Sequence, residues 1–152
     1  MALPDIFTKN VADDVIGRIN KLTPATQPLW GKMSVSQMLA HCCVTYEMVY
    51  ETKHPAPNRF MKMILKTLIK NVVTSETPYK RNSRTAPAFL ITTEKEFDKE
   101  KSRLIGYIER TSQLGAKEFN NKPSLSFGAL TTTEWNNMFY KHLDHHLAQF
   151  GV

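Results

Sequence analysis

Two histidines near the C-terminus have the spacing that presents two metal ligands from one helix. His142 and His146 are four residues apart, in a segment that also contains Trp135 and Phe139. Side chains at positions i and i+4 of a helix lie one above the other, so both imidazoles face the same point. One divalent cation would satisfy both rings. Buried imidazoles bonded to carbonyl or hydroxyl groups are the alternative, and the spacing alone does not exclude it.

A third imidazole near the pair would favour a metal site over the alternative of hydrogen-bonded core histidines. His41 is the candidate, because it also lies on an apolar face of a helical pattern. Gln37 and Gln149, each about one turn from a histidine, are candidate contacts for a bound ligand or cofactor, and both also fit the role of helix-end residues. The remaining histidines are interpreted as a loop residue, His54, and a residue flanking the site, His145.

No general base or nucleophile accompanies these histidines, so no catalytic residue is assigned. Glu47 lies about 120 degrees from His41 around its helix, and Asp144 points away from the C-terminal pair. Cys42 and Cys43 lie about 100 and 200 degrees from His41, so neither shares a metal with it. We interpret both cysteines as buried free thiols, because neighbouring residues of a helix cannot form a disulfide.

The elements that position these residues are helices. Capping boxes, in which a Ser or Thr precedes a Gln or Glu by three residues, mark three helix starts, at Ser34, Thr93 and Thr131. Broad apolar faces predict an all-α fold, a four-helix bundle with one additional short helix. The expected helices span about residues 10–22, 34–51, 59–73, 93–115 and 131–151, and residues 74–92 form a long loop.

Segments near the two ends of the chain carry a family resemblance. The stretch WGKMSVSQMLAH at 30–41 combines with TEW at 133–135 and HLDHHLAQFG at 142–151. Together they resemble the DinB/YfiT-like superfamily, and more narrowly a bacterial branch of it without assigned function. The similarity follows most of the chain in order and helix count, whereas its specific motifs lie in these segments.

This resemblance implies a bundle that holds nickel or zinc on His41, His142 and His146 and that dimerises. It also implies thiol-dependent S-transfer or isomerisation. Three neutral imidazoles leave a coordination position open, as catalytic sites do. We therefore expect a metal-dependent S-transferase or hydrolase for a small molecule, with a low-molecular-weight thiol as cosubstrate. A non-catalytic metal- or ligand-binding module in a stress response is the alternative.

Length and composition limit the classes of protein. The chain has 152 residues, 41% of them hydrophobic, which suits one domain over 1–152. No apolar run approaches the roughly 20 residues that span a bilayer. The first residues lack the basic start and apolar block of a secretory signal, so we expect a cytoplasmic protein.

The excess positive charge is concentrated in one region. Residues 53–84 contain eight Lys or Arg and one acid, which gives +7, whereas the other residues have 12 basic and 13 acidic side chains, which gives −1. Binding of nucleic acid or of an anionic membrane surface is therefore a third function class. No nucleic-acid recognition motif accompanies the charge, so a solvated helix face and a basic loop are preferred.

Overall fold

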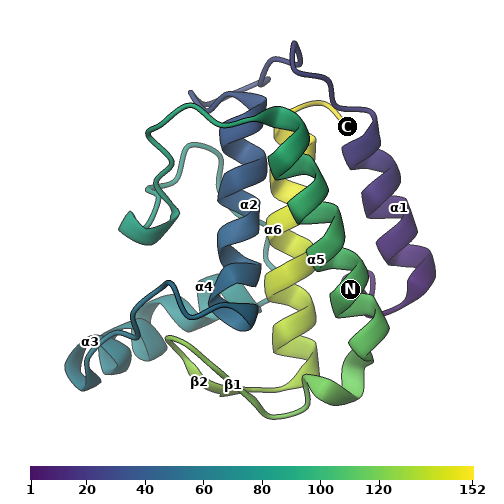
Figure 1. The fold of residues 1–152 in the computed structure, drawn as a ribbon. Coiled ribbons are helices and arrows are strands. Elements are labelled where there is room, and N and C mark those ends of the chain that lie inside the picture. Colours follow the sequence, from purple (N-terminus) through teal and green to yellow (C-terminus); the bar gives the residue numbers. More distant parts are fainter.

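Four long helices form the body of the computed structural model, which describes residues 1–152 (Figure 1). They are α1 (Lys9–Asn20), α2 (Val35–Tyr50), α5 (Phe97–Glu118) and α6 (Thr132–Gln149). The prediction of a mostly helical fold is confirmed. The short helix predicted at 59–73 corresponds to a helical segment over 59–74, and two short strands were not predicted.

Two of the three predicted capping boxes form. The hydroxyls of Ser34 and Thr131 accept from the third backbone N–H of α2 and α6, and the Gln37 and Glu134 side chains bond back to the capping residues. The box at Thr93 does not form, because α5 begins only at Phe97 and its N-cap, Glu96, makes no side-chain capping bond. The predicted N-cap, Thr93, therefore lies three residues before the observed one.

The interior is built around α2 and α6. α2 is the most buried helix and packs most extensively against α5. α6 contacts α1, α2 and α4, and its Phe139 ring lies among Tyr46, Phe119 and Trp135. Aromatic packing of this kind adds to the stabilisation from apolar burial.

A projecting arm continues from the loop after α2. Its helical residues form α3 (Arg59–Ile64), a π-helical turn η1 (Leu65–Ile69) and α4 (Lys70–Thr74), which follow one another without a break. In Figure 1 the α3 end lies away from the four long helices, while α4 packs against α6. We call residues 59–74 the arm.

Short elements complete the chain. The turn η2 (Pro87–Phe89) lies within the predicted long loop, and β1 (Lys122–Ser124) pairs antiparallel with β2 (Gly128–Leu130) between α5 and α6. The indole N–H of Trp135 donates to the carbonyl of Lys122 and ties the hairpin to α6. Three-residue strands show too few alternations to be seen as a periodic pattern, which is why the hairpin was not predicted. None of the helices is long and apolar enough to cross a membrane.

Candidate metal centre

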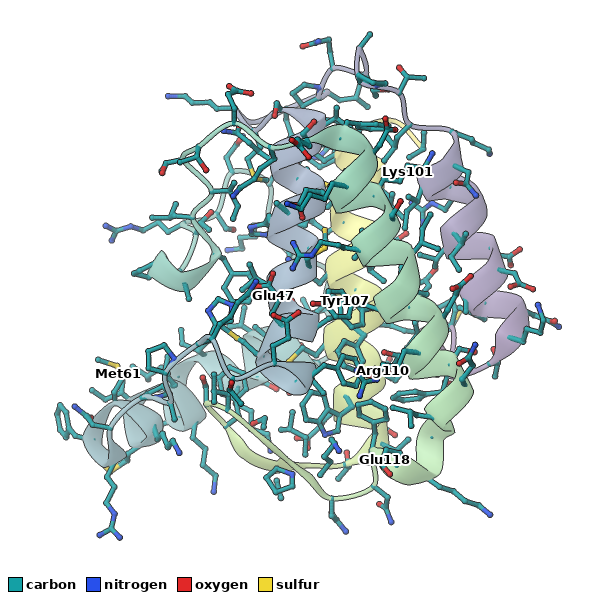
Figure 2. All side chains as sticks on the ribbon, viewed as in Figure 1. Glu47, Met61, Lys101, Tyr107, Arg110 and Glu118 are labelled. Carbon is teal, nitrogen blue, oxygen red and sulfur yellow. The ribbon has the colours of Figure 1, made fainter.

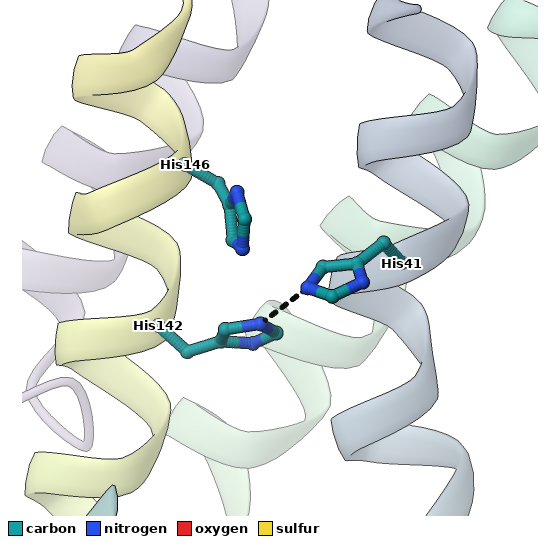
Figure 3. A group of neighbouring side chains, drawn as sticks. All are labelled: His41, His142 and His146. Atoms are coloured by element: carbon teal, nitrogen blue, oxygen red, sulfur yellow. Dashed lines mark hydrogen bonds between the residues drawn. The ribbon is translucent and has the colours of Figure 1, made fainter. Parts of the chain in front are cut away.

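The three candidate histidines meet between α2 and α6. His41 comes from α2, and His142 and His146 come from adjacent turns of α6 (Figure 3). Their ring centroids are 4.5 to 4.9 Å apart, and one ligating atom from each ring lies within 4.8 Å of the others. His41 and His146 are buried and His142 is partly exposed. The structure therefore brings together the residues that spacing and apolar context had singled out.

Each ring is held on its outer side by a different protein group. Nδ1 of His41 lies 2.9 Å from the carbonyl oxygen of Phe89, and Nδ1 of His142 lies 3.0 Å from the hydroxyl of Thr45. Nδ1 of His146 lies 2.8 Å from Oε1 of Gln149. Such outer partners fix ring orientation in metal sites. They leave the three Nε2 atoms for the interior, where those of His41 and His142 are 2.9 Å apart.

Two of these contacts fix which nitrogen carries the proton. A carbonyl oxygen only accepts, so His41 donates from Nδ1 and its Nε2 has a lone pair. The Gln149 amide donates from Nε2 to the carbonyl of Trp30 at 2.8 Å, which turns its Oε1 toward His146. His146 therefore also donates from Nδ1 and directs an Nε2 lone pair into the site.

The surroundings keep the rings neutral. Burial lowers the pKa of His41, and burial with the neighbouring imidazoles lowers the pKa of His142 well below its usual value. Burial and the proximity of His41 lower the pKa of His146 to about 3. Neutral imidazole is the form that binds a metal ion. These three residues therefore meet the donor chemistry of a divalent-metal site.

One apolar side chain, the ring of Phe89, borders the trio. The Phe89 ring lies 5.4 Å from the His41 ring and 5.8 Å from the His142 ring, measured between centroids. Its backbone carbonyl holds His41, so one residue of η2 both orients a ring and shields it. Exclusion of water strengthens electrostatic interactions within such a site.

The carboxylates near the site in sequence are engaged elsewhere. Glu47 lies where α2 meets α5 (Figure 2) and bonds to Arg103, Lys53 and His54. Burial alone would raise the pKa of Glu47, but these bonds outweigh it and lower the pKa. Asp144 pairs with Arg18 at 2.8 Å. The site therefore has no carboxylate among its contacts, as the helical angles predicted.

The two cysteines also face away from the trio. The Cys42 thiol lies against the sulfur of Met38, and the Cys43 thiol against the carbonyl of Glu100. Burial raises the pKa of Cys42 well above its usual value and that of Cys43 to about 12. Both are free, buried thiols with little thiolate at neutral pH.

The predicted ligand-contacting glutamines make bonds within the protein. Gln149 joins His146 to Trp30 through the two ends of its amide. Gln37 accepts from the Ser34 N–H in the capping box, and its amide nitrogen lies 3.4 Å from the carbonyl of Thr93. Gln149 thus reaches the trio by holding a ring, whereas Gln37 secures the start of α2.

The other two histidines have separate surroundings. His145 lies between the rings of Trp30 and Tyr79 and contacts His146 edge to face, with centroids 5.0 Å apart. His54 bonds to Glu47 at 2.7 Å. Neither belongs to the group whose ligating atoms converge.

Sequence reasoning missed Thr45 and Phe89. Thr45 had a usable signal, because it follows His41 by one helical turn and must share its face. Phe89 had none, since it contacts the site from a loop whose path no short-range pattern determines. Both residues act on the outer nitrogen of a histidine.

The comparisons with known proteins identify a family and no function. The family model described as a protein of unknown function, DUF1569, matches residues 7–151. No curated protein and no solved structure matches the chain.

The resemblance to the DinB/YfiT-like superfamily is wrong, because the family that matches is a distinct one. The residues behind that resemblance were a helix with two imidazoles four residues apart and the capped start of another helix. Both features arise wherever helices are capped or present paired histidines, so they do not identify a family. The dimer, the choice of nickel or zinc and the thiol-dependent chemistry lose the support they drew from it.

Proposed function

The chain belongs to the DUF1569 family, and we propose from its histidine trio that it binds one divalent metal ion on Nε2 of His41, His142 and His146. The observation that carries the proposal is the arrangement of the outer nitrogens. Three different groups, a carbonyl, a hydroxyl and an amide oxygen, hold the three Nδ1 atoms. Core histidines that only needed partners would gain nothing from directing their second nitrogens to a common point.

We propose that the bound metal serves a reaction on a small molecule, either hydrolysis or transfer to a thiol. A divalent cation held by neutral imidazoles keeps its charge, and supplies the means to lower the pKa of a bound water to roughly 7 or to stabilise a thiolate. The protein contributes the orientation of the rings and the apolar shield of Phe89. Zinc and nickel both suit imidazole ligands, so each is a candidate.

Thr45 can bond to His142 in either of the two protonation arrangements of that ring. Without a cation, the short contact between two Nε2 atoms requires one N–H, and His142 supplies it because His41 already carries its proton on Nδ1. Nδ1 of His142 then accepts from the Thr45 hydroxyl. When a cation takes the Nε2 lone pair of His142, the proton belongs on Nδ1, which then donates a hydrogen bond to the Thr45 hydroxyl. Thr45 serves both arrangements, because a hydroxyl both donates and accepts.

The second candidate is a non-catalytic metal-binding module. The observation that favours it is the absence of a carboxylate from the contacts of the trio, since Glu47 and Asp144 are paired elsewhere. Proton transfer by a positioned acid or base supports most hydrolytic and transfer reactions. A module that stores or senses a metal needs no such group.

Metal content tests the site itself. We expect His146→Ala to reduce zinc or nickel, measured by elemental analysis after loading and desalting, from about one ion per chain to none. His145→Ala is the matched control, since it removes a neighbouring imidazole whose ring is outside the trio, and we expect it to keep its metal. Both variants should retain a helical circular dichroism spectrum. Unchanged metal content in His146→Ala would overturn the proposed site.

A measurement of turnover distinguishes the proposed enzyme from the proposed binding module. The loaded protein is mixed with a panel of activated esters, and with small electrophiles plus low-molecular-weight thiols, before and after treatment with a chelator. An enzyme loses turnover on chelation and recovers it when metal is restored. If the loaded protein has its metal but chelation changes no rate in the panel, the binding module is favoured.

A further inference from the structure

The arm is fixed at one end and projects at the other. At its C-terminal end the Lys141 ammonium donates to the carbonyls of Val72, Ser75 and Thr77, and the Asn137 amide donates to the carbonyl of Thr74. Toward its N-terminal end neither α3 nor η1 contains a buried residue. Figure 2 shows Met61 on this outlying part, away from the long helices.

The exposed side chains of the arm are mainly apolar. Six of the ten large hydrophobic residues that are exposed in the whole molecule lie on it, with exposed fractions between 40% and 66%. They are Phe60, Met61, Met63, Leu68, Ile69 and Val72. Scattered apolar residues are ordinary on a protein surface, whereas a contiguous group indicates a surface that binds something.

The charged residues of the arm are all basic. At about 100 degrees per residue, Arg59, Lys62, Lys66 and Lys70 fall within an arc of roughly 80 degrees. Phe60, Met61, Leu68 and Val72 lie on the opposite side, whereas Met63 and Ile69 border the basic arc. Lys70 pairs with Glu134 at 2.7 Å, and the other three have no acidic partner. A short helix with an apolar face and a Lys- and Arg-rich face has the composition of helices that lie at a membrane interface.

Charge decides between a lipid surface and a second copy of the chain. Residues 53–84 have a formal charge of +7, and the rest of the chain has −1. A dimer through the arms would combine two strongly basic regions in one assembly without an acidic region to complement either, whereas an anionic surface complements the charge. Nucleic acid would complement the charge but would leave the apolar residues in water.

We propose that the arm docks on an anionic phospholipid surface, with its apolar residues at the acyl boundary and its lysines among the headgroups. The C-terminal anchor on Lys141 and Asn137 would then hold the four long helices above the membrane. The arm makes this contact without the histidine trio, so the proposal is independent of the metal.

Vesicle sedimentation with the full chain tests the docking. Vesicles of phosphatidylcholine alone are compared with vesicles in which about a third of the lipid is phosphatidylglycerol, at low and high salt. We expect binding to the anionic vesicles only, and weaker binding at high salt. Equal binding to both vesicles, or none to the anionic ones, would overturn the proposal.

Matched variants assign the binding to the arm. The double variant Lys62→Glu with Lys66→Glu should weaken vesicle binding about ten-fold or more. The control is Lys21→Glu with Lys117→Glu, which changes the net charge by the same amount away from the arm and should leave vesicle binding unchanged. Phe60→Ser with Leu68→Ser should weaken it similarly, against Leu114→Ser as the control.

Two further results would contradict the assignment to the arm. Controls that lose as much affinity as the arm variants would show that net charge or general hydrophobicity drives the binding. A wild-type dimer in light scattering that Phe60→Ser with Leu68→Ser dissociates would assign the apolar face to a second copy of the chain.

Discussion

Between α2 and α6 the chain turns polar side chains inward, whereas along the arm it leaves apolar side chains in water. The inward imidazoles each have an outer partner, so their burial is compensated. The exposed apolar residues of the arm have no comparable cover within the chain. Both regions depart from the usual distribution of polarity, and in a folded protein such departures mark places that meet something beyond the chain itself.

The largest expected effect is the loss of stability when Phe139, a residue of the interior, is truncated. Phe139 is 1% exposed and its ring lies among four other aromatic rings. Phe139→Ala removes most of that ring and leaves a cavity, so we expect the free energy of unfolding to fall by about 3–5 kcal/mol. Urea unfolding followed by circular dichroism measures it. A loss below about 1 kcal/mol would mean that the interior is far looser than the structure shows.

Metal binding should stabilise the interior without involving the arm. A ligand at a hundred times its Kd stabilises the folded state by about 2.7 kcal/mol, which for a chain of this size corresponds to a rise in Tm of about 5–10 °C. We expect this rise with zinc or nickel in the wild type and in Phe60→Ala, and none in His41→Ala. A rise that persists in His41→Ala would place the metal elsewhere.

Loss of the group that bonds to the outer nitrogen of a histidine should weaken metal binding without unfolding the site. Thr45→Val keeps the shape of the side chain but removes the hydroxyl that bonds to Nδ1 of His142. We expect metal affinity to fall about 10- to 100-fold, as measured by competition with a chromogenic chelator. Thr45→Ser restores a hydroxyl and should recover most of the affinity. Equal weakening in both variants would show that the hydroxyl alone does not set the metal affinity, because Thr45→Ser retains it.

Local signals in the sequence were sufficient to single out the three histidines that meet in the structure, but not the residues and elements around them. His142 and His146 share a face because of helical geometry, and the capping boxes at Ser34 and Thr131 mark the starts of the two helices that carry the trio. That His41 meets the other two depends on tertiary packing, which the apolar context of His41 only suggested.

The same limit explains what the sequence did not predict. The contact of Phe89 with His41 joins a loop to a helix 48 residues away in sequence, and no short pattern encodes it. The pattern over residues 59–73 correctly indicated an amphipathic helix, but amphipathicity does not say whether the apolar side faces the protein or the solvent. In the structure, much of it faces the solvent.

The smallest expected effect is the change in stability when Phe60 of the arm is truncated, which is to be compared with the truncation of Phe139. Phe60 is 66% exposed, so truncating its ring removes few contacts, and we expect Phe60→Ala to change the free energy of unfolding by less than about 0.5 kcal/mol. The same urea titration measures it, at several protein concentrations. A loss of more than about 1 kcal/mol that grows with protein concentration would mean that Phe60 is buried against another chain in solution. The contrast between two phenylalanines of one chain would then reflect assembly, and the arm would be an interface between copies and not a face for lipid.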